Sequence, residues 1–263
     1  MGEVLDLAFR IFKVTLIRAL PYGIGAVIAQ QISSLYRFSG VAPGHTLLSH
    51  PAAGRGVFVI GALLALLAWS SMLLCQQAIV EHRLTSARAE LGVALRRMAS
   101  FVPATVLFLV VVAGDFGLLW ALPMEYRVQA RIPLLLVSLY LAVLLSCMWP
   151  AVLLGGSGPI GALRQSVRLV WGNWWRVTLV YVVGGAIVLV VAILLGALIA
   201  TLVSWLGVGV PAMTSVVYAE VANALGAIMA PFAGALLLAI YGDLRVRREG
   251  TDLQQRIVGA VAE

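Results

Sequence analysis

The segment from Pro159 to Trp205 decides how this chain folds. It begins PIGALRQSVRLVWGNWWR, from Pro159 to Arg176, and then runs from Val177 to Trp205 without a charged residue. In the first part, arginines and apolar residues alternate at helical spacing, which predicts a short amphipathic helix. The second part exceeds the roughly 20 residues that a helix needs to cross a bilayer. We therefore expect an amphipathic helix at the membrane surface that leads into a transmembrane span.

The composition indicates that lipid surrounds most of the chain. Hydrophobic residues make up 62% of the 263 residues, and charged residues only 11%. Soluble domains carry about 25% charged residues, and a soluble core cannot hide so much apolar surface. The net charge of +7 is typical of arginines that flank membrane spans and does not indicate a nucleic-acid partner. We expect an all-α fold with one integral membrane domain over residues 1–263.

Six apolar segments are long enough to cross about 30 Å of hydrocarbon. They are residues 19–36, 57–80, 101–122, 132–154, 177–205 and 213–241. Amphipathic segments at residues 2–18, 81–100 and 159–176 precede the first, third and fifth of them. The predicted fold is a polytopic membrane protein with six transmembrane helices in three hairpins. Each hairpin is preceded by a cytoplasmic amphipathic interfacial helix.

The three hairpins form an internal repeat in this interpretation. The triplets Ala8-Phe9-Arg10, Ala94-Leu95-Arg96 and Ala162-Leu163-Arg164 occupy equivalent places in the three amphipathic segments. The repeat-like units are residues 2–80, 84–154 and 159–241, and a cytoplasmic tail of residues 242–263 follows. The alternative is that a helix-rich composition alone produces the likeness.

The distribution of basic residues predicts the orientation. Of the 18 Lys and Arg, 14 fall on the side of the two termini, and the other four are Arg37, Arg55, Arg127 and Arg131. The positive-inside rule then places both termini in the cytoplasm. The two cysteines, Cys75 and Cys147, lie inside apolar runs, which indicates buried thiols rather than a disulfide framework.

Small residues recur every four positions in the last two spans. They are Ala192, Gly196 and Ala200 in the fifth span, and Ala222, Gly226, Ala230 and Gly234 in the sixth. This spacing lets helix backbones approach closely. It indicates an interface either between these two spans or between the subunits of a homo-oligomer. The alternative is that Gly and Ala are simply frequent here.

The most distinctive segment follows the last span. It reads YGDLRVRREGTDL, from Tyr241 to Leu253, and has three arginines before Gly250. A glycine after a basic turn predicts the end of a helix. Thr251 with Gln254 predicts a capping box that starts a new short helix.

This segment, together with the stretch from Ala162 to Arg176, resembles a family of bacterial multi-pass proteins. They are relatives of the membrane domain found on some glycerophosphoryl diester phosphodiesterases. The likeness is confined to these two segments, and the rest of the chain is similar only in hydropathy. It implies a bacterial inner-membrane protein. It does not imply phosphodiesterase activity, because the catalytic barrel of such enzymes is a separate soluble domain that we do not expect here.

Three polar residues inside the spans form a candidate intramembrane site. Asp115 lies in the third span, and Glu220 and Asn223 lie in the sixth. A carboxylate within the membrane costs roughly 2.5–3.5 kcal/mol and should face the helix bundle or water. One interpretation is that Asp115 is a proton or cation site, or a polar group in a lateral groove. The other is that it bonds to Arg127, Arg131 or a backbone group near the outer turn, or is simply protonated. The three residues form one cluster only if the third and sixth spans touch.

No motif predicts catalysis or a metal centre. His45 and His50 lie in a loop rich in Pro and Gly without further ligands nearby. The loop Gly155–Gly158 lacks the Gly-Lys-Ser/Thr ending of a phosphate-binding loop and is interpreted as a turn. We expect no catalytic residue, no cofactor and no metal, and an enzyme is not favoured.

The candidate binding surface is a basic cytoplasmic face. It consists of Arg10, Arg96, Arg164, Arg168, Arg245, Arg247 and Arg248. Each basic residue near a membrane surface attracts anionic headgroups by about 1 kcal/mol. We expect a non-enzymatic scaffold, or an assembly or lipid-interacting factor, whose partners are membrane lipids and a cytoplasmic or membrane protein. The alternative is a transporter or lipid translocator that uses Asp115 and Glu220, because transporters combine internal repeats with intramembrane acids.

Overall fold

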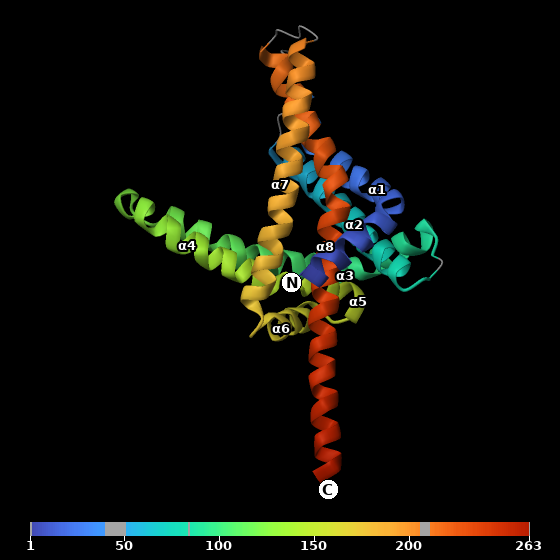
Figure 1. Ribbon diagram of the computed structural model, residues 1–263. Coiled ribbons are helices and arrows are strands. Elements are labelled where there is room, and N and C mark those ends of the chain that lie inside the picture. Colours follow the sequence, from blue (N-terminus) through green and yellow to red (C-terminus); the bar gives the residue numbers. More distant parts are fainter. Residues whose placement is uncertain (1, 40–50, 84, 206–210, 263) are drawn as a thin grey trace. The chain divides into compact units, whose positions relative to one another are not determined.

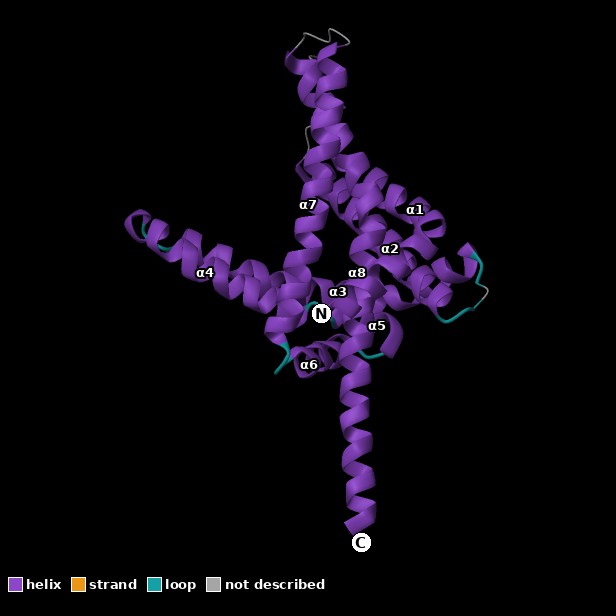
Figure 2. Ribbon diagram, viewed as in Figure 1, coloured by secondary structure: helices purple, strands orange, loops and turns teal. Residues whose placement is uncertain are grey.

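The computed structural model of the chain is helical. It describes residues 2–39, 51–83, 85–205 and 211–262, and no strand occurs among them. The helices, labelled in Figure 1, are α1 (Gly2–Ser39), α2 (Pro51–Val80), α3 (Ala87–Ala121), α4 (Met124–Leu145), α5 (Met148–Gly155), α6 (Pro159–Val170), α7 (Trp174–Trp205) and α8 (Pro211–Ala262). In the described part of the chain, only short loops and turns separate them (Figure 2). The predicted all-α class is confirmed.

Among the residues that the structure describes, six stretches of helix are long and apolar enough to cross a membrane. They are Gly2–Ile32, Arg55–Val80, Ala87–Gly114, Met124–Gly155, Trp174–Leu202 and Ala222–Arg248. We refer to them as the first to the sixth span, and each overlaps one predicted segment. In the fifth span only 6% of the most apolar window is buried within the chain. Such an exposed apolar helix requires lipid or a protein partner around it.

The first two amphipathic segments are not helices of their own. α1 and α3 each continue unbroken from the amphipathic segment into the span, through Pro21 and Pro103. The third segment differs because α6 ends before Gly172, which has a φ of 89°. That left-handed conformation suits glycine, which has no Cβ, and it separates α6 from α7.

The fourth span is broken near its end. α4 ends at Leu145 and α5 begins at Met148. Pro150 has no N–H to donate to the carbonyl of Ser146 four residues earlier. The Ser146 hydroxyl also donates a 2.8 Å hydrogen bond to the carbonyl of Val143, which competes with regular helical bonding. The predicted span of residues 132–154 therefore consists of two helices joined by a turn.

The last helix does not end at Gly250. α8 is continuous over 52 residues, Pro211–Ala262, and carries Gly250 in its interior (Figure 1). The predicted helix end at Gly250 and the predicted new helix after Thr251 are therefore wrong. A glycine inside a helix costs only about 1 kcal/mol relative to alanine, which the neighbouring helix-forming residues offset.

The chain divides into two compact units, each assembled from segments far apart in the sequence. Unit 1 comprises Met1–Leu7, Arg96–Tyr181 and Leu236–Glu263, and unit 2 comprises Ala8–Leu95 and Val182–Ala235. The core of unit 1 is mainly apolar. Its fully buried side chains include Phe101, Met148, Leu153, Val170 and Ile240.

Arg97 binds one helix end within unit 1. Its Nη1 donates hydrogen bonds to the carbonyl of Leu153 and, at 3.4 Å, to that of Val152. Both carbonyls lie in the last turn of α5, where a cation is also favoured by the helix dipole. Arg97 therefore joins the beginning of the third span to the end of the fourth.

The core of unit 2 is partly polar. Thr15, Ser70, Ser71 and Gln76 are all fully buried. The Nε2 of Gln76 donates to the carbonyl of Pro231 at 2.7 Å and to the Oγ1 of Thr15 at 3.4 Å. Its Oε1 has no hydrogen-bond partner among the described residues. This amide therefore connects α1, α2 and α8.

The predicted seam between the fifth and sixth spans is not found at its glycines. A Cβ built on Gly234 would lie 2.5 Å from the Oε1 of Gln76 and 3.0 Å from the Cε of Met72, so Gly234 packs against the second span. A Cβ on Gly196 or on Gly226 would meet no described atom within 4 Å. An interface between subunits remains a prediction.

The three repeated triplets share one pattern of burial. Their alanines, Ala8, Ala94 and Ala162, are each 0% exposed. Seven residues further along, Thr15, Phe101 and Leu169 are also buried. Positions separated by seven residues lie on the same face of a helix, so each triplet begins an inward face.

Candidate functional site

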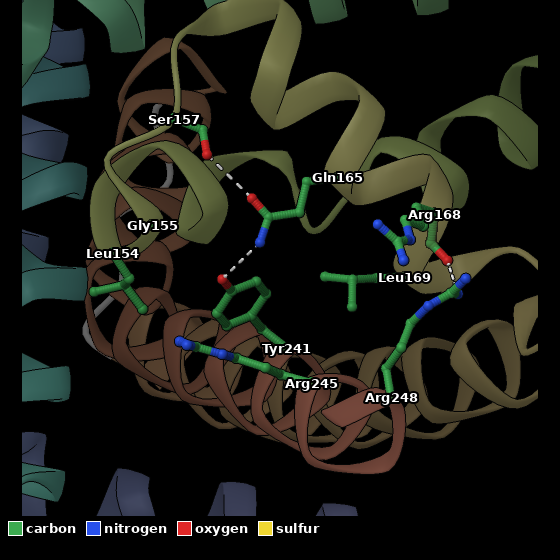
Figure 3. A pocket seen from close by; sticks show the side chains of 9 residues that line it. All are labelled: Leu154, Gly155, Ser157, Gln165, Arg168, Leu169, Tyr241, Arg245 and Arg248. Atoms are coloured by element: carbon green, nitrogen blue, oxygen red, sulfur yellow. Dashed lines mark hydrogen bonds between the residues drawn. The ribbon is translucent and has the colours of Figure 1, made fainter. Parts of the chain in front are cut away.

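A basic pocket in unit 1 lies where two spans end. Its volume is about 470 Å³, which is within the usual range for small-molecule sites. It is lined by Leu154, Gly155, Ser157, Gln165, Arg168, Leu169, Tyr241, Arg245 and Arg248 (Figure 3). The first two residues belong to the end of the fourth span, and the last three to the end of the sixth. Ser157, from the loop before α6, and Gln165, Arg168 and Leu169 of α6 complete it.

Backbone geometry sets the direction in which α6 leaves the fourth span. Gly156, directly after α5, has a φ of 64° and ends that helix in the left-handed conformation. Pro159 occupies the first turn of α6, where its missing N–H is not needed.

One face of α6 is buried and holds the helix in place. The buried residues are Ala162, Ser166, Leu169 and Val170. The Ser166 hydroxyl donates a 2.8 Å hydrogen bond to the carbonyl of Leu144 in α4. With this face fixed, Gln165 and Arg168 lie along the pocket (Figure 3).

A short series of hydrogen bonds crosses the pocket. The Ser157 hydroxyl donates to the Oε1 of Gln165 at 3.2 Å, and the Nε2 of Gln165 donates to the hydroxyl of Tyr241 at 3.5 Å (Figure 3). Tyr241 is only 4% exposed. The three side chains connect the loop before α6, α6 itself and α8, so they give the pocket a fixed polar side.

Three arginines make the pocket positive. Arg168 comes from α6, and Arg245 and Arg248 come from α8. The Nη1 of Arg248 donates to the backbone carbonyl of Arg168, which joins the two helices directly (Figure 3). Among the nine described lining residues there is no Asp or Glu. Guanidinium groups bind phosphate and carboxylate oxygens through several N–H donors at once, so this pocket suits an anion.

Asp243, two residues before Arg245 on α8, forms ion pairs with other arginines. It lies 3.3 Å from Arg176, at the start of the fifth span, and 3.0 Å from Arg247 one turn further along α8. The carboxyl is only 19% exposed. Asp243 therefore joins the start of the fifth span to the end of the sixth, and Arg247 serves this pair instead of lining the pocket.

The predicted basic residues have different positions in the structure. Arg168, Arg245 and Arg248 line the pocket, and Arg164 lines a cavity next to it. Arg96 is exposed near the beginning of α3, and Arg10 is exposed on α1 in unit 2. The predicted basic face is thus brought together in part, at the contact of α6 with α8.

The predicted intramembrane polar site lies mostly outside the described residues. The side chains of Asp115 and Glu220 are not described, although their backbones belong to α3 and α8. Asn223 is half-buried. His45 and His50 also lie outside the described residues. Among the residues that are described, no group of three His, Cys, Asp or Glu could hold a metal ion.

Two lining residues, Ser157 and Gln165, have no distinctive signal in the sequence. The loop Gly155–Gly158 is predicted as a simple turn, yet it contributes Gly155 and Ser157 to the pocket. The only local signal is that Gln165 and Arg168 are three apart on α6 and therefore neighbours on its surface. The sequence therefore predicts that Gln165 and Arg168 lie on the same side of α6, but it does not predict that α8 faces this side.

Comparison with known protein families places this part of the chain in a family. A family model described as "Domain of unknown function (DUF7847)" matches residues 83–244. This range contains seven of the nine residues that line the pocket, all except Arg245 and Arg248. No curated protein and no solved structure matches the chain.

Proposed function

The chain belongs to the DUF7847 family, whose function is unknown, and we propose from the pocket that it binds phosphate-bearing lipid headgroups at a basic cytoplasmic face. In this function it is a non-enzymatic membrane scaffold or assembly factor, which holds a partner protein beside anionic lipid. The proposal is based on one observation, the pocket at the ends of two spans. Three arginines line this pocket, and its described lining residues include no Asp or Glu.

The depth of the pocket supports a lipid headgroup as ligand. Its residues come from the ends of the fourth and sixth spans, where a membrane helix meets the headgroup region. Trp174 and Trp175, at the start of the fifth span, belong to the same unit. Tryptophan prefers the boundary between hydrocarbon and headgroups, so these rings agree with that depth.

Three side-chain contacts support the pairing of spans into hairpins. Arg97 with Leu153 joins the third span to the fourth, and Arg176 with Asp243 joins the fifth to the sixth. Gln76 with Thr15 connects the second span to the first. The contacts of Arg97 and Arg176 each link the early part of one span to the late part of the next, as a hairpin requires. The shared burial of the triplet alanines supports the internal repeat.

The orientation and the host membrane follow from the sequence. We place the pocket and both termini in the cytoplasm because the positive-inside rule assigns the arginine-rich ends of membrane helices to that side. The resemblance to relatives of the phosphodiesterase membrane domain implies a bacterial inner membrane. Its inner surface carries anionic phospholipid, which attracts basic residues.

Lipid binding by matched charge variants tests this function. The pocket variant combines Arg168→Gln and Arg245→Gln, and the control combines Arg83→Gln and Arg88→Gln, two exposed residues outside both the pocket and the predicted basic face. The full chain in phosphatidylcholine nanodiscs is titrated with soluble dioctanoyl phosphatidylglycerol, and binding is followed by calorimetry.

At about 1 kcal/mol for each arginine, the pocket variant should lose about 2 kcal/mol, or roughly 30-fold in affinity. The control should bind the lipid like the unmodified chain. The lipid affinity of the control and of the unmodified chain should fall at higher salt, because salt screens the charges. Equal affinity of the pocket variant and the control, with both folded, would contradict the proposed function.

A further inference from the structure

A second cavity adjoins the basic pocket and has a different chemistry. Its volume is about 460 Å³. It is lined by Leu163, Arg164, Val167, Arg168, Trp171 and Arg248. Two aliphatic side chains and an indole ring replace the hydroxyls and the amide of the basic pocket. We call this cavity the apolar groove.

The two cavities share Arg168 and Arg248. Both residues line the basic pocket and the apolar groove, and the hydrogen bond from the Nη1 of Arg248 to the carbonyl of Arg168 holds them together. In Figure 3 the two arginines lie at the end of the basic pocket away from Ser157. The surroundings therefore change from polar to apolar across one pair of guanidinium groups.

We propose that one anionic phospholipid occupies both cavities. Its phosphate lies among Arg168, Arg245 and Arg248, and one acyl chain lies in the apolar groove along Val167 and Trp171. The inference rests on the proposed function and specifies the ligand of the same pocket. A molecule in which a charged phosphate is joined to hydrocarbon matches the change of chemistry, whereas a free phosphate leaves the groove unused.

The surface of α6 favours a lipid over an acidic peptide. Trp171 and Ile160, at opposite ends of this helix, are 65% and 63% exposed. Large apolar side chains on a basic amphipathic helix are typical of segments that lie in the acyl boundary of a membrane. A groove on such a helix is within reach of lipid chains, so its occupant is a lipid already present at that depth.

The test separates the phosphate from the acyl chain. Val167→Trp fills the groove, and Leu163→Ser is a second groove variant that makes its wall polar. Val246→Trp is the matched control, because Val246 is exposed on α8 and lines neither cavity. The full chain in phosphatidylcholine nanodiscs is titrated with dibutanoyl and dioctanoyl phosphatidylglycerol, with inorganic phosphate, and with an acidic amphipathic peptide.

The unmodified chain and Val246→Trp should bind the dioctanoyl lipid at least about tenfold more tightly than the dibutanoyl lipid, because longer chains bury more CH₂ groups. Both groove variants should lose most of this gain and keep their affinity for inorganic phosphate. The peptide should not compete with the lipid.

Two results would overturn the inference and leave the proposed function intact. One is an unchanged effect of chain length in both folded groove variants, while Arg168→Gln with Arg245→Gln still weakens binding. The other is that the peptide displaces the bound lipid at a lower concentration than the dioctanoyl lipid does. If the double arginine variant weakens neither phosphate nor lipid binding, the proposed function itself fails.

Discussion

The side-chain amide of Gln76 on α2 donates a 2.7 Å hydrogen bond to the backbone carbonyl of Pro231 on α8. Pro231 has no N–H, so the carbonyl of Ala227 one turn earlier lacks its usual helical donor. Gln76 is completely buried at this interruption of α8. The contact between α2 and α8 is otherwise apolar, so the Gln76 amide finds a hydrogen-bond acceptor at few relative positions of the two helices. This bond therefore sets the register of α2 against α8 within unit 2.

Gln76→Glu should destabilise the protein far more than Gln76→Leu. The carboxylate would be buried against the Pro231 carbonyl, and no described residue donates a hydrogen bond to the position of its second oxygen, which costs several kcal/mol. Leucine loses one hydrogen bond of about 1 kcal/mol but also removes the Oε1 that has no partner among the described residues. The unfolding midpoint in detergent at pH 8, measured by intrinsic fluorescence, gives the order. A midpoint for the glutamate variant as high as that of the leucine variant would show that the site is not closely packed.

Gly23→Ala should destabilise unit 2, whereas Gly25→Ala should not. A Cβ on Gly23 would overlap the carbonyl oxygen of Ala227, a backbone atom of α8 that cannot move aside easily. Overpacking of this kind costs about 1–3 kcal/mol. A Cβ on Gly25 meets only the Cβ of Ala68 at 4.0 Å, so alanine there is neutral or stabilising by up to about 1 kcal/mol. The thermal midpoint of Gly23→Ala should lie below that of the unmodified chain, and the midpoint of Gly25→Ala should not. A midpoint of Gly23→Ala equal to or above that of the unmodified chain would indicate that α1 and α8 do not touch at Gly23.

Arg97→Ala should destabilise unit 1 by about 1.5–3 kcal/mol, the usual value of a hydrogen bond to a charged group. Arg97 donates to two carbonyls in the last turn of α5, and the variant leaves both without this donor. The neighbouring Arg96 is exposed, so Arg96→Ala is the matched control and should change stability by less than about 0.5 kcal/mol. Urea unfolding followed by fluorescence compares the two. Equal midpoints would contradict the contact with α5.

Asp243 and Arg176 should be coupled in a double-mutant cycle. Their side chains are 19% and 24% exposed and lie 3.3 Å apart, so water screens the pair less than a surface ion pair. Asp243→Asn and Arg176→Gln should each destabilise, and the double variant should cost less than the sum of the two. Arg247 is 48% exposed, and its pair with Asp243 should therefore show coupling of about 0.5 kcal/mol or less. If the losses of stability for Asp243→Asn and Arg176→Gln were additive, the start of the fifth span would not be joined to the end of the sixth by this pair.

Hydropathy predicts the positions of the long apolar helices well, because apolar runs of this length require lipid or a protein partner around them. The second predicted span, residues 57–80, and the observed Arg55–Val80 end at the same residue. Helix breaks are harder to predict, as Gly172 and Gly250 show. Both follow a basic helical turn, but only Gly172 separates two helices. α6 is held against α4 by Ser166 and Leu144, so the chain has to turn before α7, and no described contact imposes a turn at Gly250.

The arginines of the candidate site could be predicted as a group, but their arrangement could not. Basic residues collect at the ends of spans for reasons of orientation, and this places Arg168 and Arg248 on one predicted face. The hydrogen bond that joins them connects positions 80 residues apart. Local periodicity contains no information about such a contact. Ser157 and Gln165 are polar residues of common type, and only the approach of α6 to α8 gives them a place beside Tyr241.

The unbroken course of α8 past its arginines has a mechanical consequence. The helix continues from Arg248 to Ala262, which at 1.5 Å per residue is a stiff arm about 20 Å long. Torque applied to the helix beyond Arg248 would be transmitted along it and would turn Arg245 and Arg248 about the helix axis. A protein bound along this arm would rotate one wall of the two arginine-lined cavities without contacting any other residue that lines them.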